Sequence, residues 1–183
     1  PFTLMKQTIN IGLLGCGNVG RSVFDLLTEN NDLISAKIPS EFQIKKICVN
    51  DLNKDRGIAK KYFTNDINEI LQDEEIDIVV ELIGDRPEAL EAIRQALQNG
   101  KAVVTANKAA IAKHGLELFQ LAKDNQTQIL FEASVGGGIP VLRSLREGIS
   151  ANQILTLRGI INGTCNYILS EMENSNETFD LVL

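Results

Sequence analysis

The chain has 183 residues, of which 44% are hydrophobic and 23% are charged, and its 18 Lys and Arg against 24 Asp and Glu leave a net charge of −6. This balance is typical of a soluble globular protein and excludes disordered and low-complexity chains. No basic cluster and no apolar stretch near the ~20 residues that span a bilayer occur, so we expect no nucleic-acid partner and no membrane span. The three cysteines, Cys16, Cys48 and Cys165, form no C-x-x-C pair. They favour reduced thiols in a cytoplasmic protein over disulfides or a zinc site.

Short apolar runs alternate with helical patterns along the chain. We predict strands at residues 9–14, 44–49, 77–83, 102–105, 128–131 and 154–161. Apolar residues recur at helical spacing between them, and the predicted helices cover residues 18–27, 87–98, 109–124, 140–149 and 166–173. Residues 30–43 are predicted to form a long irregular connection, and residues 51–63 a short charged helix with a turn. This alternation predicts an α/β fold, a doubly wound parallel sheet built from β-α-β units.

A glycine-rich segment, Gly15-Cys16-Gly17-Asn18-Val19-Gly20, joins the first predicted strand to the first predicted helix. This is the setting in which G-x-G-x-x-G binds a dinucleotide in Rossmann-type folds. Gly15 permits the tight turn, Gly17 lets a pyrophosphate approach the backbone, and Gly20 lets the helix pack closely on the strand. The N–H groups of the helix N-terminus then face the phosphates. The alternative is a glycine turn without a ligand.

Two residues at the end of the second strand, Asn50 and Asp51, are candidates for contact with the ribose of a dinucleotide. Asp51 can accept a hydrogen bond from the 2′-hydroxyl of NAD, although it lies further along the chain than the usual ~20 residues after the glycines. Lys54 and Arg56 could instead meet a 2′-phosphate. Equally, Asp51 could cap the helix predicted after it.

Three later segments also carry polar groups at strand ends. Thr105-Ala106-Asn107-Lys108 follows the fourth strand, where Lys108 could hold a substrate oxygen or simply be solvated. In the segment from Glu132 to Pro140, a carboxylate precedes three successive glycines, a pattern that suits a hard cation but by itself favours a flexible turn. Asn162-Gly163-Thr164 offers small polar donors. Cys165 is a weak candidate for a nucleophile because no histidine is near it in sequence.

Together these motifs resemble homoserine dehydrogenase through nearly the whole chain. The resemblance rests on residues 15–20, on Val80-Glu81-Leu82-Ile83-Gly84, on residues 105–109 and 132–140, and on residues 159–169. It implies an NAD- or NADP-dependent oxidoreductase that interconverts L-homoserine and aspartate 4-semialdehyde, a step in threonine, isoleucine and methionine biosynthesis. The alternatives are another semialdehyde or dihydrodipicolinate-type reductase, and a nucleotide-binding module without catalysis.

The resemblance also implies roles for individual residues. Lys108 matches a catalytic lysine at the cofactor and substrate. Glu132, through its carboxylate, and Val135, Gly137 and Ile139, through backbone carbonyls, match a sodium site. Gly163 matches a contact to cofactor and substrate, and Thr164 a contact to substrate. The expected cofactor contacts are Gly15, Gly17, Asn18, Val19, Gly20, Asn50, Asp51, Thr105, Lys108 and Gly163.

The chain departs from the family pattern in three places. Asn50 stands where many relatives have Arg, which weakens the expected preference for NADP, and Cys165 stands where Thr is common. The acidic substrate-binding residues and a second catalytic lysine of the family are expected beyond Leu183. We therefore expect a cofactor domain over residues 1–150, the start of a substrate domain over 151–183, and nucleotide binding without turnover by this chain alone. A whole protein containing it is expected to be a homo-oligomer.

Overall fold

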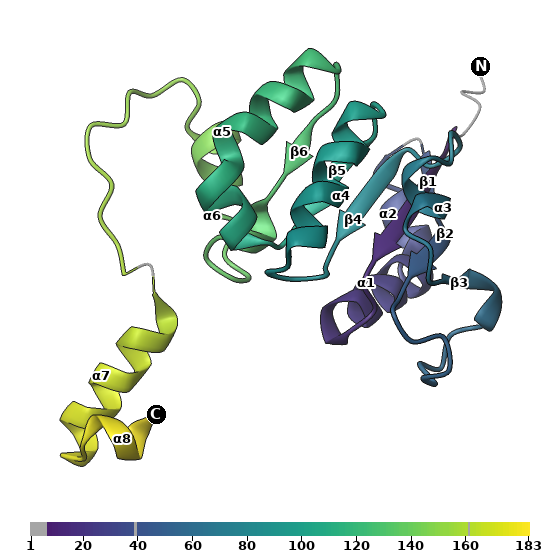
Figure 1. Cartoon of the computed structure of the whole chain (residues 1–183). Helices are drawn as coiled ribbons and strands as arrows, with labels where there is room; N and C mark the ends of the chain where they lie inside the picture. The colour runs from purple at the N-terminus through teal and green to yellow at the C-terminus, as the bar shows by residue number, and fades with distance from the viewer. Residues whose placement is uncertain (1–6, 39, 161) are drawn as a thin grey trace. The chain divides into compact units, whose positions relative to one another are not determined.

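The computed structural model describes residues 7–38, 40–160 and 162–183 (Figure 1). The chain divides into two compact units, which meet in sequence between Ile139 and Pro140. The first unit contains a parallel sheet of six strands in the order β3-β2-β1-β4-β5-β6. The strands are β1 (Gln7–Leu14), β2 (Ser40–Cys48), β3 (Phe63–Thr64), β4 (Ile78–Glu81), β5 (Ala102–Thr105) and β6 (Ile129–Leu130).

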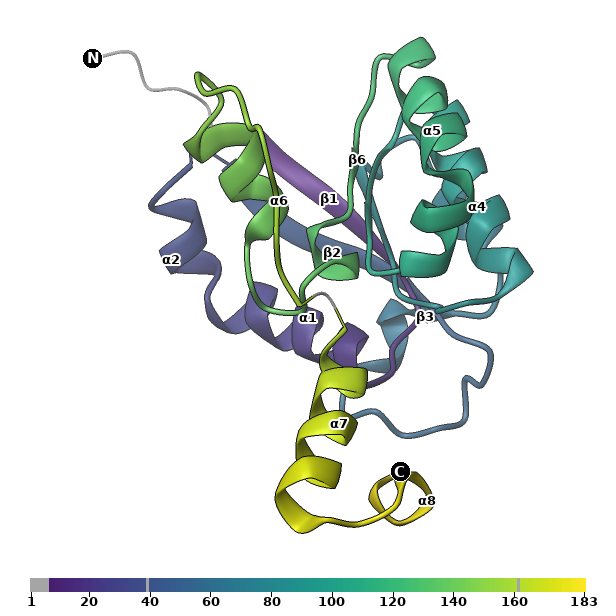
Figure 2. The same cartoon turned by 90° about the vertical axis from the view of Figure 1, so that its left-hand side faces the viewer.

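The sheet is doubly wound, as the sequence predicts. Helices α1 (Asn18–Glu29) and α2 (Asn31–Ser35) lie on one face, and α4 (Pro87–Gln98) and α5 (Lys108–Asp124) lie on the other (Figures 1 and 2). A short helix, α3 (Asn68–Leu71), packs into the same core as α4 and α5. The strand order reverses between β1 and β4, and ligands of such sheets bind at the carboxyl ends of the strands beside this reversal.

Each face of the sheet has its own apolar core. Successive residues of a strand point to opposite faces, so Leu13 and Val80 belong to the core under α1, while Leu14 and Val79 belong to the core under α4 and α5. The side chains of Leu13, Leu14 and Val79 are completely buried. Central strands covered on both faces read as continuous apolar runs, which is why β1 and β4 are recognisable in the sequence.

Two predicted connections before β4 are wrong. Within the predicted irregular link of residues 30–43, residues 31–35 form α2 and residues 40–43 begin β2, while Pro39 lies outside the described residues. The polar start of β2 alternates in burial and is tied to α2 by a hydrogen bond from Asn31 Nδ2 to the Phe42 carbonyl (2.7 Å). Residues 51–63 contain no α-helix, because the side chains of Asp51 and Asp55 accept hydrogen bonds from backbone N–H groups two residues on. Such local bonds compete with helix formation.

The second unit differs most from the prediction. The predicted helix at 140–149 is a short turn of helix α6 (Val141–Arg143) followed by a π-turn (Ser144–Gly148). Residues 154–160 of the predicted sixth strand are exposed and have no regular structure, and Ile161 lies outside the described residues. The sheet nevertheless has six strands, because the short strand β3, which was not predicted, lies at its edge. The predicted last helix is confirmed within α7 (Gly163–Ser175), which is followed by α8 (Phe179–Val182).

Throughout the described part of the chain, no helix combines the length and the apolar character needed to cross a membrane.

Candidate functional site

A cavity of about 590 Å³ opens at the carboxyl ends of β1, β2 and β4. It therefore lies beside the reversal in strand order, where a doubly wound sheet binds its ligand. Its walls carry three cationic and three anionic side chains together with small and apolar residues. The lining residues are Gly15, Cys16, Gly17, Cys48, Val49, Asn50, Asp51, Lys54, Arg56, Asn65, Asp66, Ile67, Leu82, Ile83, Arg86 and Glu88.

The glycine loop forms one wall of this cavity, and its three glycines serve different needs. Gly15 has φ +103°, and a Cβ there would lie 2.8 Å from the Leu82 carbonyl oxygen. A Cβ on Gly20 would overlap the carbonyl oxygen of Gly15, so only glycine allows this approach of α1 to the loop. Among the described residues, no atom lies within 4 Å of the place that a Cβ on Gly17 would occupy. Gly17 is thus not required by packing, and it leaves open space over the loop.

The N-terminus of α1 meets the loop at this open space. Gly17 precedes the helix, and the first helical hydrogen bond runs from Arg21 N–H to the Gly17 carbonyl (2.9 Å). The N–H groups of Asn18, Val19 and Gly20 therefore have no partner in the helix. The first turn, which is fully described, contains no acidic side chain. The helix N-terminus thus offers free donors and a partial positive charge to an anion.

The end of β2 forms the opposite wall. Asn50 and Asp51 are exposed and line the cavity, but Asp51 caps a turn, with Oδ1 accepting from Asn53 N–H (2.8 Å), and not a helix. Arg56 donates to the Asp51 carbonyl (2.8 Å) and lies over the Phe63 ring, 5.5 Å from its centre. These contacts hold the Arg56 guanidinium at the cavity wall.

The two cysteines of the first unit are half-buried and not activated. Burial raises the pKa of both Cys16 and Cys48, although Arg56 and Arg21 partly oppose the effect at Cys16. A raised pKa keeps these thiols neutral and poorly nucleophilic.

A buried polar network joins the ends of β4 and β5. Glu81 and Thr105 are completely buried, and the Thr105 hydroxyl donates to Glu81 Oε2 (2.6 Å). The Thr105 side chain thus faces Glu81, so a cofactor contact at this position would have to use the backbone. Asn107 caps α5 by accepting from Ala110 N–H (3.0 Å), and Lys108 is the exposed first residue of α5.

Glu81 is the residue that sequence reasoning missed as part of the site. The available signal was a single carboxylate in the otherwise apolar run from Ile78 to Ile83. A charged residue that is fully buried needs hydrogen-bonding partners, but the sequence does not name them.

The loop after β6 contains all four residues of the expected cation site. Glu132 begins a short 3-10 turn that ends at Ser134, and Gly136 and Gly137 have φ values of +71° and +63°. Within the described residues, no group of three or more His, Cys, Asp or Glu side chains gathers. A cation at this loop would therefore depend mainly on backbone carbonyls, such as those of Val135, Gly137 and Ile139.

Gly163 and Thr164 belong to the second unit. They form the exposed first turn of α7, which Asn162 caps by accepting from Cys165 N–H (2.9 Å). Small residues at a helix start leave backbone donors open to a ligand.

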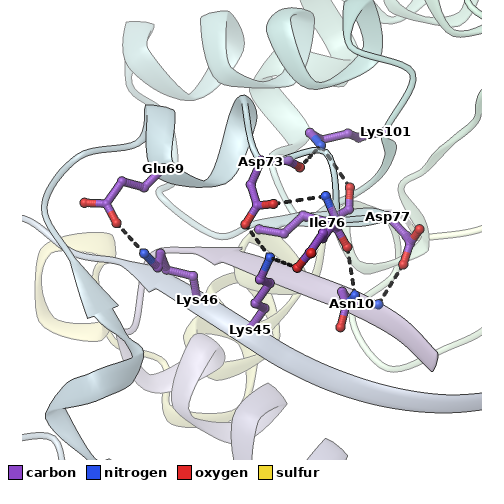
Figure 3. A network of polar contacts seen from close by, with 9 residues as sticks. Asn10, Lys45, Lys46, Glu69, Asp73, Ile76, Asp77 and Lys101 are labelled. Atoms are coloured by element: carbon purple, nitrogen blue, oxygen red, sulfur yellow. Dashed lines mark hydrogen bonds and ion pairs between the residues drawn. The ribbon is translucent and has the colours of Figure 1, made fainter.

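A second cavity of about 500 Å³ is lined by Leu71, Gln72, Glu74, Ile76, Asp77, Asn99, Gly100 and Lys101. Lys101 is 5% exposed, and its Nζ donates to the carbonyls of Asp73 and Ile76 (Figure 3). Burial lowers the pKa of Lys101. In the same network, Lys45 pairs with Asp73 (2.7 Å) (Figure 3). These contacts fix the loop that leads into β4.

The strand order, the glycine loop and the open helix N-terminus define the first unit as a dinucleotide-binding domain of Rossmann type. Two family models identify the family within this class of dinucleotide-binding proteins. Residues 15–132 match the model described as "Homoserine dehydrogenase, NAD binding domain", and residues 140–183 match the model described as "Homoserine dehydrogenase". The chain therefore belongs to the homoserine dehydrogenase family, as the motifs predict.

Curated and solved relatives agree with this assignment. The homoserine dehydrogenase of Helicobacter pylori is 46% identical over 96% of this chain. The crystal structure of a homoserine dehydrogenase from Thiobacillus denitrificans has a TM-score of 0.91 and 44% identity, covering 97% of this chain and 42% of its own. A hyperthermophilic archaeal homoserine dehydrogenase in complex with NADPH has a TM-score of 0.79 and 26% identity, covering 96% of this chain and 59% of its own.

The chain spans about 41% of the length of its curated relatives from Helicobacter pylori and Neisseria gonorrhoeae. The boundary expected at residue 150 between a cofactor domain and a substrate domain stays a prediction, as do the roles of the individual site residues.

Proposed function

We propose that the first unit binds NADP or NAD, and that a whole protein containing this chain interconverts L-homoserine and L-aspartate 4-semialdehyde. The observation that carries the proposal is the open space over Gly17 beside the free N–H groups of α1. A pyrophosphate needs a backbone without a side chain and donors that no other group uses. Membership of the homoserine dehydrogenase family supports the choice of substrate.

In this mechanism the residues of the chain bind and orient, and the nicotinamide, when bound, supplies the hydride acceptor or donor. Lys108 would hold the substrate oxygen and stabilise the charge that grows on it. Its position supports this role, because a cation in the first turn of a helix opposes the helix dipole and does not favour folding. Gly163 is proposed to contact the cofactor and the substrate, and Thr164 the substrate.

The preference between NADP and NAD is proposed to be small. Asp51 would accept a hydrogen bond from the 2′-hydroxyl of NAD and repel a 2′-phosphate. Lys54 and Arg56 line the same cavity and would attract a 2′-phosphate. Since Asn50 adds no charge, the opposing groups nearly balance.

A sodium ion is proposed at the loop from Glu132 to Ile139. Oxygen ligands from one carboxylate and the carbonyls of Val135, Gly137 and Ile139 suit a hard cation, and neither thiolate nor imidazole is offered. The left-handed backbone at Gly136 and Gly137 supports the proposal, because it lets successive carbonyls turn toward one point.

The test is titration of the purified chain with NADPH, NADH and their oxidised forms by calorimetry, followed by an assay with L-homoserine. We expect binding without turnover, because the chain spans only about 41% of the length of its curated relatives and turnover needs acid-base and substrate-positioning groups in addition to a bound cofactor. In a whole protein containing the chain, Lys108→Ala should lower turnover much more than cofactor affinity. Absence of nucleotide binding, or an ordinary turnover rate by the chain alone, would contradict the proposal.

A further inference from the structure

The end of β4 carries a carboxylate in the interior of the sheet. Glu81 is paired in register with Thr105 of the neighbouring strand β5, and both side chains are 0% exposed. A buried charge is costly unless hydrogen bonds replace its water. The contacts of Glu81 therefore indicate what the carboxylate is for.

Three donors meet this carboxylate. Oε1 accepts from Ile83 N–H (2.7 Å) and Gly84 N–H (3.3 Å), and Oε2 accepts from the Thr105 hydroxyl (2.6 Å). A carboxylate only accepts hydrogen bonds, so all three donors can point at it together. The chain after β4 is thereby folded back onto the last side chain of its own strand.

The network continues to the start of α5. The Thr105 hydroxyl oxygen accepts from Asn107 N–H (3.0 Å), and Asn107 Nδ2 donates to the Gly84 carbonyl (2.9 Å). Asn107 also caps α5, and Lys108 is the next residue. The loops after β4 and β5 are thus tied to each other by one closed set of hydrogen bonds that begins at Glu81.

We propose that Glu81 is a positioning residue: through Thr105 and Asn107 it fixes the start of α5 and with it Lys108 relative to the nucleotide cavity. The inference rests on the proposed nucleotide binding, because Leu82 and Ile83, in the loop that Glu81 holds, line that cavity. An apolar residue of similar size would fill the space but leave the three donors without a partner, at the usual cost of unsatisfied buried groups.

Replacement of Thr105 separates positioning from simple stability. Thr105→Val keeps the shape of the side chain but removes the hydroxyl that links Glu81 to Asn107, whereas Thr105→Ser keeps the hydroxyl. Lys101→Met is the control for lost stability, because Lys101 is also buried and also donates hydrogen bonds, to the carbonyls of Asp73 and Ile76, but lies at the other end of β5 and outside the nucleotide cavity.

Two readouts are needed, amide hydrogen exchange in the free chain and the emission of bound NADPH at saturation. The chain contains no Trp, so nicotinamide emission is read without tryptophan overlap. Thr105→Val should speed exchange at Asn107 and Ala110 by at least tenfold, weaken NADPH binding by at least tenfold and change the emission of the bound nucleotide. Thr105→Ser should restore the wild-type exchange rates, NADPH affinity and emission. Glu81→Gln should resemble Thr105→Val, because an amide facing Thr105 leaves the hydroxyl proton without an acceptor.

The outcomes distinguish this inference from the proposed function. If the wild-type chain binds no nucleotide, the proposed function fails and the inference fails with it. If the wild-type chain binds NADPH but Thr105→Val changes neither exchange nor emission, only the inference is overturned. It is also overturned if Lys101→Met changes the emission as much as Thr105→Val does, because loss of stability would then explain both changes.

Discussion

Replacing Gly17 by Ala should strongly lower the affinity for the nucleotide without disturbing the fold. Gly17 has φ −84°, which any residue adopts, and a Cβ there would meet none of the described atoms within 4 Å. The added methyl group would instead occupy the space over the N-terminus of α1 that we assign to the pyrophosphate.

The size of the effect follows from the donors at that position. A phosphate displaced by a methyl group would lose at least one hydrogen bond from the first turn of α1, and a hydrogen bond to a charged group contributes roughly 1.5–3 kcal/mol. Since about 1.4 kcal/mol corresponds to a tenfold change in Kd, the affinity should fall roughly tenfold to a hundredfold. The free energy of unfolding should change by no more than about 0.5 kcal/mol, as for other substitutions without contacts.

Gly20→Ala is the matched comparison, since it adds the same methyl group three residues away. There the Cβ would overlap the Gly15 carbonyl oxygen, so α1 must move away from the loop. Overpacking of this kind typically costs ~1–3 kcal/mol. Both variants are measured by calorimetric titration with NADPH and by urea unfolding followed by circular dichroism.

The reasoning is refuted if Gly17→Ala binds NADPH as tightly as the wild-type chain, because the nucleotide would then not lie on this loop. It is also refuted if Gly17→Ala is destabilised as much as Gly20→Ala, because the loss of binding would then reflect the fold.

Three other predictions concern cofactor choice, the cation and acid stability. The chain should prefer NADP over NAD by less than about tenfold, ~1.4 kcal/mol, and Asn50→Arg should shift calorimetric affinities toward NADP; a hundredfold native preference would contradict this. Glu132→Ala should weaken NADPH binding and speed proteolysis of residues 132–140. If the wild-type chain binds NADPH equally well in sodium and in a large organic cation, the cation site is contradicted. The hydrogen bond from Lys45 lowers the pKa of Asp73, so the pair stabilises the fold above the unfolded pKa, and this contribution disappears as pH falls through the lower folded pKa. The free energy of unfolding, measured with urea, should therefore fall less between pH 6 and about pH 3 in Lys45→Met than in the wild-type chain. An equal fall in both chains would argue against the pair of Lys45 and Asp73.

Much of the first unit could be predicted because its signals are local. The strand at 102–105 and the helix at 87–98 coincide with β5 and α4, since an apolar run, a proline at the helix start and a following Asn-Gly all act within a few residues. Residues 154–160 mislead for the same reason. Their apolar residues resemble a strand, but a strand also needs a neighbour to pair with, and no local pattern reports one.

The sequence by itself determined the family, the glycine loop and the alternation of strands and helices, because each depends on residues close together in the chain. The tertiary structure decided the order of the strands, the place of β3 at the sheet edge and the network around Glu81. Glu81 and Thr105 are 24 residues apart and meet only because β4 and β5 pair in one particular register. A shift of that register by one residue would turn one of the two side chains to the opposite face of the sheet, so their hydrogen bond depends on long-range packing that no single segment encodes.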